Sequence, residues 1–140
     1  MNRLLIAVTM ITAFVHPWAA RAADSRSLER NFLGLWEGVD VNDGSKRTIS
    51  ITDHEGDGVF EVASRDTFWT LCDGDRGLEI ASGAVDDDGV LVTEGIVTCF
   101  DDPVQLPIRQ TYEYSRRSDT LVATPVGTGL IPITLHRMSG

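Results

Sequence analysis

The sequence predicts an all-β fold, a small antiparallel meander β-barrel of about eight strands with a short N-terminal helix. Short runs of alternating apolar and polar residues follow one another from Trp36 to Arg137, at the spacing of roughly 8–12 residues that is typical of sandwiches and barrels. Glycine and aspartate separate these runs, and Asp outnumbers Glu by 14 to 7, which favours turns over helices. The chain lacks the alternation of strands with helices that a doubly wound fold requires. A two-sheet β-sandwich is the alternative.

The first 22 residues have the pattern of a cleaved signal peptide. Arg3 precedes a twelve-residue, mainly apolar run, Leu4 to Val15, which is too short to span a bilayer as a helix. Ala20-Arg21-Ala22 fits the small-x-small rule and predicts cleavage after Ala22. A buried N-terminal helix is the alternative interpretation. We therefore expect a mature domain, residues 23–140, that is secreted or periplasmic and has no membrane anchor, since no cysteine lies at the cleavage site.

The charge of the chain excludes one class of partner. The 140 residues are 42% apolar and 24% charged, which is the composition of one globular domain. The formal net charge is −9, and it becomes −11 when the predicted cleavage removes Arg3 and Arg21. A surface this acidic argues against binding to nucleic acid or to an anionic membrane. Much of the charge lies in Asp-rich turns, where it serves turn geometry and solubility.

The mature chain is expected to begin with its one helical segment, residues 24–33. A serine can cap the first turn, and Leu28 and Phe32 recur at helical spacing. Gly34 ends the segment, and the sequence then changes to the short alternating runs of a β protein.

Roughly eight to ten short strands are expected after this helix. Ile49 and Ile51 share one face of their run while hydroxyl side chains occupy the other, which is the alternation of a half-buried strand. In the run 77–81, Leu78 and Ile80 are expected to face the core. Closing the sheet removes its exposed edges, so a barrel is preferred to a sandwich. The predicted strands are Trp36–Val41, Lys46–Thr52, Val59–Ser64, Thr67–Cys72, Gly77–Ala81, Val90–Thr93, Ile96–Phe100, Ile108–Ser115, Leu121–Thr124 and Ile131–Arg137.

Cys72 and Cys99 are the only cysteines of the chain. An even count in an exported protein predicts a disulfide, which here would place two strands side by side. On the chain-entropy model, such a bridge contributes about 3.5 kcal/mol to stability. A redox pair or a zinc site is not supported, because the sequence has no Cys-x-x-Cys motif and no histidines at metal-binding spacing.

Two short motifs resemble the lipocalin-like (calycin) barrels. Gly34-Leu35-Trp36 has the Gly-x-Trp pattern that opens many of these barrels, and the run ending in Arg137 is similar to their last strand. The resemblance implies that Arg137 lies over Trp36 and closes one end of the barrel. An ordinary core tryptophan is the alternative for Trp36. Asp40 shares the parity of Trp36, so it would place a carboxylate inside the barrel unless Gly38 introduces a bulge.

Catalytic and metal-binding motifs are missing from the sequence. His54 and His136 lie outside any metal-binding spacing, and no Gly-x-Ser-x-Gly turn is present. The acidic segments 53–57, 73–75 and 86–88 lack the calcium-loop pattern. We therefore predict a non-enzymatic protein without cofactor, metal or catalytic residues. Catalysis by carboxylates paired across strands is the alternative, because a single sequence cannot pair them.

Three aromatic residues are the candidate ligand-binding side chains. Tyr112 and Tyr114 share one face of a predicted strand, and Trp69 lies on another. Inside a barrel they would give a small apolar ligand an apolar wall with a polar group; ordinary core packing is the alternative. Two functions are therefore expected: binding of a small apolar ligand, or a protein-interaction or inhibitor module of the cell envelope that presents the loop 101–107. A cavity lined by these aromatic residues would favour the first function, and a filled barrel with an ordered, protruding loop at 101–107 would favour the second.

Overall fold

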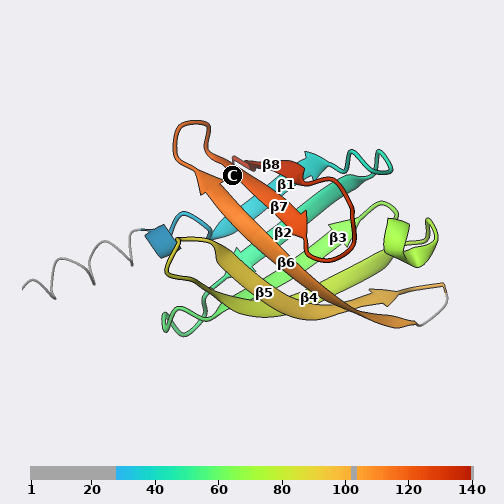
Figure 1. The fold of residues 1–140 in the computed structure, drawn as a ribbon, viewed down its shortest axis with the longest axis horizontal. Coiled ribbons are helices and arrows are strands. Elements are labelled where there is room, and N and C mark those ends of the chain that lie inside the picture. Colours follow the sequence, from blue (N-terminus) through green and yellow to red (C-terminus); the bar gives the residue numbers. More distant parts are fainter. Residues whose placement is uncertain (1–27, 102–103, 140) are drawn as a thin grey trace, which may run out of the picture.

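The structure, a computed structural model, describes residues 28–101 and 104–139. They form a closed barrel of eight antiparallel strands in which each strand pairs with the next and the last closes against the first (Figure 1). The predicted all-β class and meander barrel are confirmed. The predicted signal peptide, residues 1–22, lies outside the described residues. The strands are β1 (Gly34–Val39), β2 (Lys46–Thr52), β3 (Phe60–Asp66), β4 (Gly77–Val85), β5 (Leu91–Cys99), β6 (Gln105–Ser115), β7 (Thr120–Pro125) and β8 (Ile133–Arg137).

The described part of the predicted helix 24–33 is a single turn. The Asn31 amide donates to the Leu28 carbonyl, and the Phe32 amide donates to the Glu29 carbonyl. This turn ends with Phe32 buried against the barrel. It therefore covers one end of the barrel, and a short 3-10 turn, η1 (Thr70–Cys72), lies at the other end (Figure 1).

The prediction of a strand at 67–72 is wrong. The last residue of β3 pairs directly with the first residue of β4, Asp66 with Gly77. The residues between them, 67–76, have no neighbouring strand and form a connection, called here the Trp69 connection. Within it, the amides of Cys72 and Gly74 both donate to the Trp69 carbonyl, and Asp73 adopts a left-handed conformation. The predicted disulfide is present and joins this connection to the end of β5, so it does not link two strands.

The two predicted strands 90–93 and 96–100 are one strand, β5. Gly95 does not interrupt it, because the glycine permits a close approach to β4: a Cβ at this position would collide with the backbone of Ile80 and Ala81. Gly83 on β4 meets the Val92 backbone in the same way. These close approaches allow β4 and β5 to pair over nine register partners. The paired length exceeds that of the separate strands predicted from the sequence.

The face of β4 is opposite to the one predicted. Ile80 is 56% exposed and Leu78 is half-buried, whereas Glu79 between them is fully buried. The register explains this orientation, because Glu79 lies opposite the buried Ser64 of β3 and the buried Val97 of β5. β4 thus places the Glu79 carboxylate inside the barrel and the Ile80 side chain on its outer surface.

Candidate functional site

One end of the barrel, called here the Arg137 end, is closed by an arginine on a tryptophan. The Arg137 guanidinium lies 4.1 Å from the centre of the Trp36 ring. Its Nη1 and Nη2 donate to the carbonyls of Leu33 and Asn31 at 2.6 and 2.9 Å, and its Nε donates to the Asp119 carboxylate at 3.1 Å. This is the arrangement that the lipocalin-like resemblance implies.

Tyr114 belongs to the same end. Its ring meets those of Trp36 and Phe32 edge-on, at 6.3 and 6.4 Å between centroids, and its hydroxyl donates to Asp119 at 3.0 Å. The Trp36 indole donates to the Phe32 carbonyl at 2.9 Å. The polar groups of Arg137, Trp36 and Tyr114 therefore have partners, the buried Asn31 side-chain nitrogen is without one, and Tyr114 serves packing.

The opposite end, called the Arg47 end, also places an arginine on a tryptophan. The Arg47 guanidinium lies 4.7 Å from the centre of the Trp69 ring, and it donates from Nε and Nη2 to the Asp66 carboxylate at 2.8 and 2.6 Å. Asp40 lies 3.5 Å from the same guanidinium. The β1–β2 register is regular through Gly38, so the carboxylate of Asp40 points inward without a bulge and meets a cation there.

A set of buried polar side chains, the polar layer, extends from this pair into the barrel. It comprises Asp40, Arg47, Ser64, Asp66, Glu79 and Gln110. The Gln110 side-chain amide donates to Glu79 at 2.6 Å. Six atoms of buried side chains in or beside the layer have no hydrogen-bond partner: Arg47 Nη1, Ser64 Oγ, Trp69 Nε1, Glu79 Oε1, Gln110 Oε1 and the Tyr112 hydroxyl. Two carboxyl groups, Asp66 and Asp40, thus contact one buried guanidinium, and the Glu79 carboxyl is close enough to be influenced by its charge.

Burial changes the proton affinity of these groups. Loss of hydration raises the pKa of Glu79 to about 7, although the Arg47 charge and the Gln110 hydrogen bond act in the opposite direction. Burial also raises the pKa of Asp66 in spite of its Arg47 partner, and burial together with Glu79 raises that of Tyr112. The sequence analysis missed Glu79 and Gln110. The small inward residues Gly77, Ala81 and Gly83 of the same strand were the available signal.

The candidate ligand-binding residues do not line one cavity. Tyr114 packs at the Arg137 end and Trp69 at the Arg47 end, while Tyr112 is fully buried in the main core. The cavity beside Trp69 and Arg47 has a volume of about 10 Å³. That is room for about one water molecule, compared with the roughly 300–1,000 Å³ of a ligand pocket.

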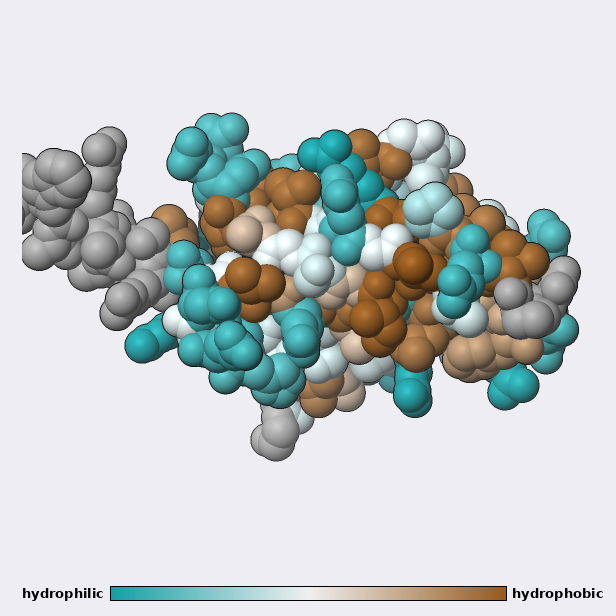
Figure 2. All heavy atoms as spheres, turned by 90° about the horizontal axis from the view of Figure 1, so that it is seen from below, coloured by the Kyte–Doolittle hydropathy of each residue, from teal (hydrophilic) through white to brown (hydrophobic). Residues whose placement is uncertain are grey.

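The larger hollow lies on the outside of the barrel, over β2 to β6. This outer groove has a volume of about 740 Å³. A row of directly opposed, outward-facing residues from four neighbouring strands is called here the outer belt: Ala63, Ile80, Ile96 and Pro107. The first three line the groove, and Pro107 continues the row beside it on β6. Ile80 and Ile96 are 56% and 45% exposed. Figure 2 looks at this side and shows apolar side chains gathered over one half of the face, with hydrophilic side chains around them.

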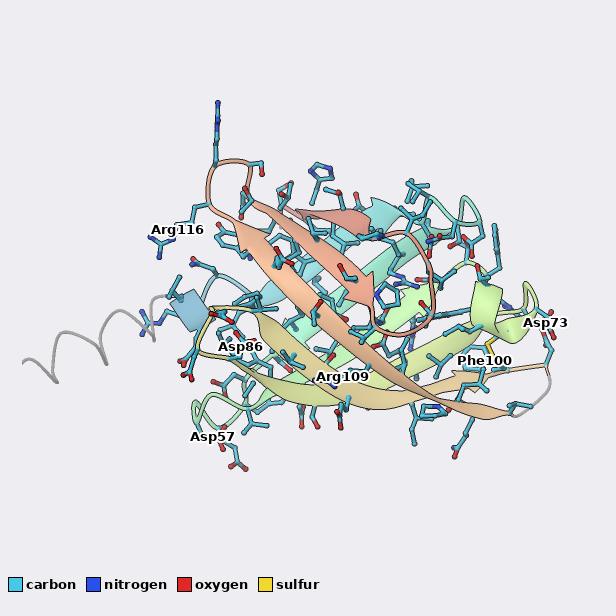
Figure 3. All side chains as sticks on the ribbon, viewed as in Figure 1. Asp57, Asp73, Asp86, Phe100, Arg109 and Arg116 are labelled. Atoms are coloured by element: carbon cyan, nitrogen blue, oxygen red, sulfur yellow. A yellow bond between two sulfur atoms is a disulfide. The ribbon has the colours of Figure 1, made fainter. Side chains whose placement is uncertain are left out.

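A charged row lies two residues along the strands from the outer belt. Its register partners are Thr52, Glu61, Ser82, Glu94 and Arg109. His54 lies 3.4 Å from Glu61, and Arg109, on the outside of β6 (Figure 3), lies 3.8 Å from Glu94. All four side chains are more than half exposed, so these contacts are weak and exchangeable.

A second apolar hollow of about 650 Å³ lies beside the β1–β8 closure, with Val39 and Val41 in its wall. The predicted interaction loop 101–107 is shorter than expected, because β6 already begins at Gln105; residues 102–103 are outside the described part. Among the described residues, no three His, Cys, Asp or Glu side chains are arranged to hold a metal ion. The same part of the chain contains no helix of the length and apolarity needed to cross a membrane.

No family model, curated protein sequence or solved structure matches this chain.

Proposed function

We propose that the mature chain is an exported, non-enzymatic protein-interaction module that binds its partner in the outer groove. The observation that carries this proposal is the filled interior. Trp36 at one end, Tyr112 in the core and Trp69 at the other end are each at most 1% exposed. An interior packed in this way favours the interaction module over a carrier of a small apolar ligand, because the carrier needs an enclosed space of ligand size.

The buried carboxyl groups support a non-enzymatic role. A carboxyl with a pKa near 7 suits acid–base catalysis, and Glu79 has that property. However, Glu79 has no exposed surface and faces the barrel interior between β3 and β5. A general acid must reach its substrate within hydrogen-bond distance, so we assign Glu79 to the polar layer and not to chemistry.

Export is supported by the disulfide between Cys72 and Cys99, which fits an oxidising compartment. It agrees with the predicted signal peptide. We therefore place the proposed interaction in the periplasm or outside the cell.

Site-specific photo-crosslinking in the native host tests this function. A photoreactive phenylalanine analogue replaces Ile96 in the outer groove, Val41 in the second hollow, or Met138, which is 39% exposed and lines neither hollow. We expect a discrete protein adduct from position 96 only. The captured protein, produced separately, must then bind the purified barrel in calorimetry.

Native mass spectrometry of the untreated protein tests the competing function, a carrier of a small ligand. If the barrel retains a small molecule and position 96 yields no adduct, it is a ligand carrier and the proposal is wrong. Adducts from position 41 alone would move the interface to the second hollow and overturn the placement proposed here.

A further inference from the structure

The outer belt and its charged row together define the kind of partner that the groove fits. We infer that the partner presents a basic amphipathic helix, which lies across the strands with its apolar stripe on the outer belt and its lysine or arginine residues against Glu61 and Glu94. This inference rests on the proposed function and adds the chemistry of the bound segment. Three properties of the groove lead to it.

The first property is the direction of the apolar row. Ile80, Ile96 and Pro107 are consecutive register partners, so the row crosses the strands instead of following one of them. A segment that contacts all three must therefore cross the strands too. Strand addition at an edge is excluded as the binding mode, because β3 to β6 each have two paired neighbours within the closed barrel.

The second property is the spacing of the row. Neighbouring strands lie about 4.8 Å apart, so the outer belt offers an apolar contact at about that interval. Side chains three and four residues apart on a helix are about 5–6 Å apart. Alternate side chains of an extended chain are more than about 6.5 Å apart. The helical interval is the closer match, which favours a helix as the bound segment.

The third property is the asymmetry of charge. On one side of the outer belt, the charged row carries Glu61 and Glu94, whose side chains are 66% and 76% exposed. The same row also carries Arg109, whose exposed contact with Glu94 is weak enough for a partner's lysine to replace it. On the other side, the opposed residues are Thr48, Arg65, Leu78, Thr98 and Gln105, which include no acid. A helix with a basic flank gains attraction on one side only, and this fixes its direction across the strands.

A designed peptide pair tests the inference. The probe is an 18-residue helix with a leucine stripe and a lysine flank, and its control has glutamate in place of lysine. Binding to the full mature protein is followed by amide chemical shifts. We expect the lysine peptide to shift amides of β3 to β6 and the glutamate peptide to bind at least tenfold more weakly.

Matched variants separate the groove from the general acidity of the protein. Ile96→Ser and the double change Glu61→Gln with Glu94→Gln should each weaken the lysine peptide at least tenfold. Met138→Ser and the double change Asp87→Asn with Glu113→Gln remove comparable apolar area or equal charge outside both hollows and should change affinity less than twofold. All altered side chains are exposed, and a thermal melt of each variant verifies the fold.

Three results would overturn the inference: no binding of the lysine peptide, equal losses in groove and control variants, or shifts centred on another face. The crosslinking experiment separates this failure from that of the proposed function. If position 96 captures a partner whose binding segment lacks a basic amphipathic helix, the function stands and the helix inference is wrong. If position 96 captures nothing and the peptide does not bind, both are wrong.

Discussion

Both ends of the barrel place an arginine on a tryptophan beside an aspartate, but the two pairs lie in opposite surroundings. At the Arg137 end, the guanidinium is partly exposed, and each of its three nitrogens donates to an acceptor. At the Arg47 end, the guanidinium is 4% exposed, Nη1 has no partner, and the Trp69 indole nitrogen has none either. The same residue pair thus has all its guanidinium nitrogens hydrogen-bonded at the Arg137 end. At the Arg47 end it leaves buried nitrogens without acceptors, which costs free energy.

The comparison shows how the cost of an ion pair depends on hydration. An exposed pair contributes little, since water already solvates both charges. A buried pair loses that hydration, so removing one partner leaves a charge without compensation. We therefore expect substitutions of equivalent residues at the two ends to differ strongly in effect.

Asp66→Ala should have the largest effect of the changes considered. It removes the carboxylate that accepts hydrogen bonds from Nε and Nη2 of the buried Arg47 and leaves Asp40, at 3.5 Å and without a hydrogen bond to it, as the contacting anion. The expected loss is about 3–5 kcal/mol in the free energy of unfolding. Urea denaturation at pH 7.5 measures it. A loss below about 1 kcal/mol would mean that water reaches Arg47 and that the Arg47 end is not sealed.

Loss of the disulfide should have the next largest effect. The bridge closes a loop with a sequence separation of 27, and the chain-entropy model gives it about 3.5 kcal/mol. We expect the double change Cys72→Ser with Cys99→Ser to lower stability by about that amount. Hydrogen exchange should accelerate first in the Trp69 connection and only later around Trp36. Equal acceleration at both ends would show that the bridge stabilises the whole barrel uniformly.

Glu79→Gln should increase stability, in a pH-dependent way. Because the pKa of Glu79 is about 7 in the folded state and about 4.5 when unfolded, the folded protein binds the extra proton between these values. The contribution of Glu79 therefore becomes less favourable as pH rises from about 4.5 to 7, and its full penalty persists above pH 7. At pH 8 the variant should be more stable by up to roughly 3 kcal/mol, at about 1.4 kcal/mol per pKa unit.

The difference between Glu79→Gln and the parent protein should shrink as pH falls from 8 to 4.5. Chemical denaturation over this range measures it, and Glu55→Gln, a change at an exposed position, serves as the control. A pH-independent difference would show that Glu79 is ionised throughout the range.

Asp119→Ala should have the smallest effect. Asp119 is exposed, and Arg137 retains the carbonyls of Leu33 and Asn31 as acceptors when it is removed. The expected loss is below about 1 kcal/mol and should diminish in high salt. A loss as large as that of Asp66→Ala would remove the distinction between the two ends.

The Arg137 end was accessible to sequence reasoning because its signals are local. Gly34-x-Trp36 and the terminal Arg137 sit at the two ends of a periodic pattern, and parity alone turns both side chains toward the core. The β-barrel followed from the alternation and from the Asp- and Gly-rich turns for the same reason. Short-range patterns specify strands well when one face is buried.

The Arg47 end and the outer belt depend on register between strands, which one sequence does not contain. Leu78 and Ile80 look like a buried face, and only the pairing of Glu79 with Ser64 shows that the strand has the opposite orientation. Thr67–Cys72 has the composition of a strand but lacks a neighbour to pair with. The alignment of Ile80 with Ile96 and Pro107 likewise appears only in three dimensions.

The closure between β1 and β8 is the one strand pair of the barrel that joins segments far apart in the chain. Every other strand pair joins neighbours in the chain, so each hairpin can form as soon as its two strands are available, whereas the Trp36–Arg137 register requires the first and last strands to meet. The cost of closing that long loop falls on a contact of only two register partners, compared with nine between β4 and β5. Until β8 arrives, Trp36 has no guanidinium over it and the sheet has two open edges. Completion of the ring is therefore the step at which this protein ceases to be prone to edge-to-edge association.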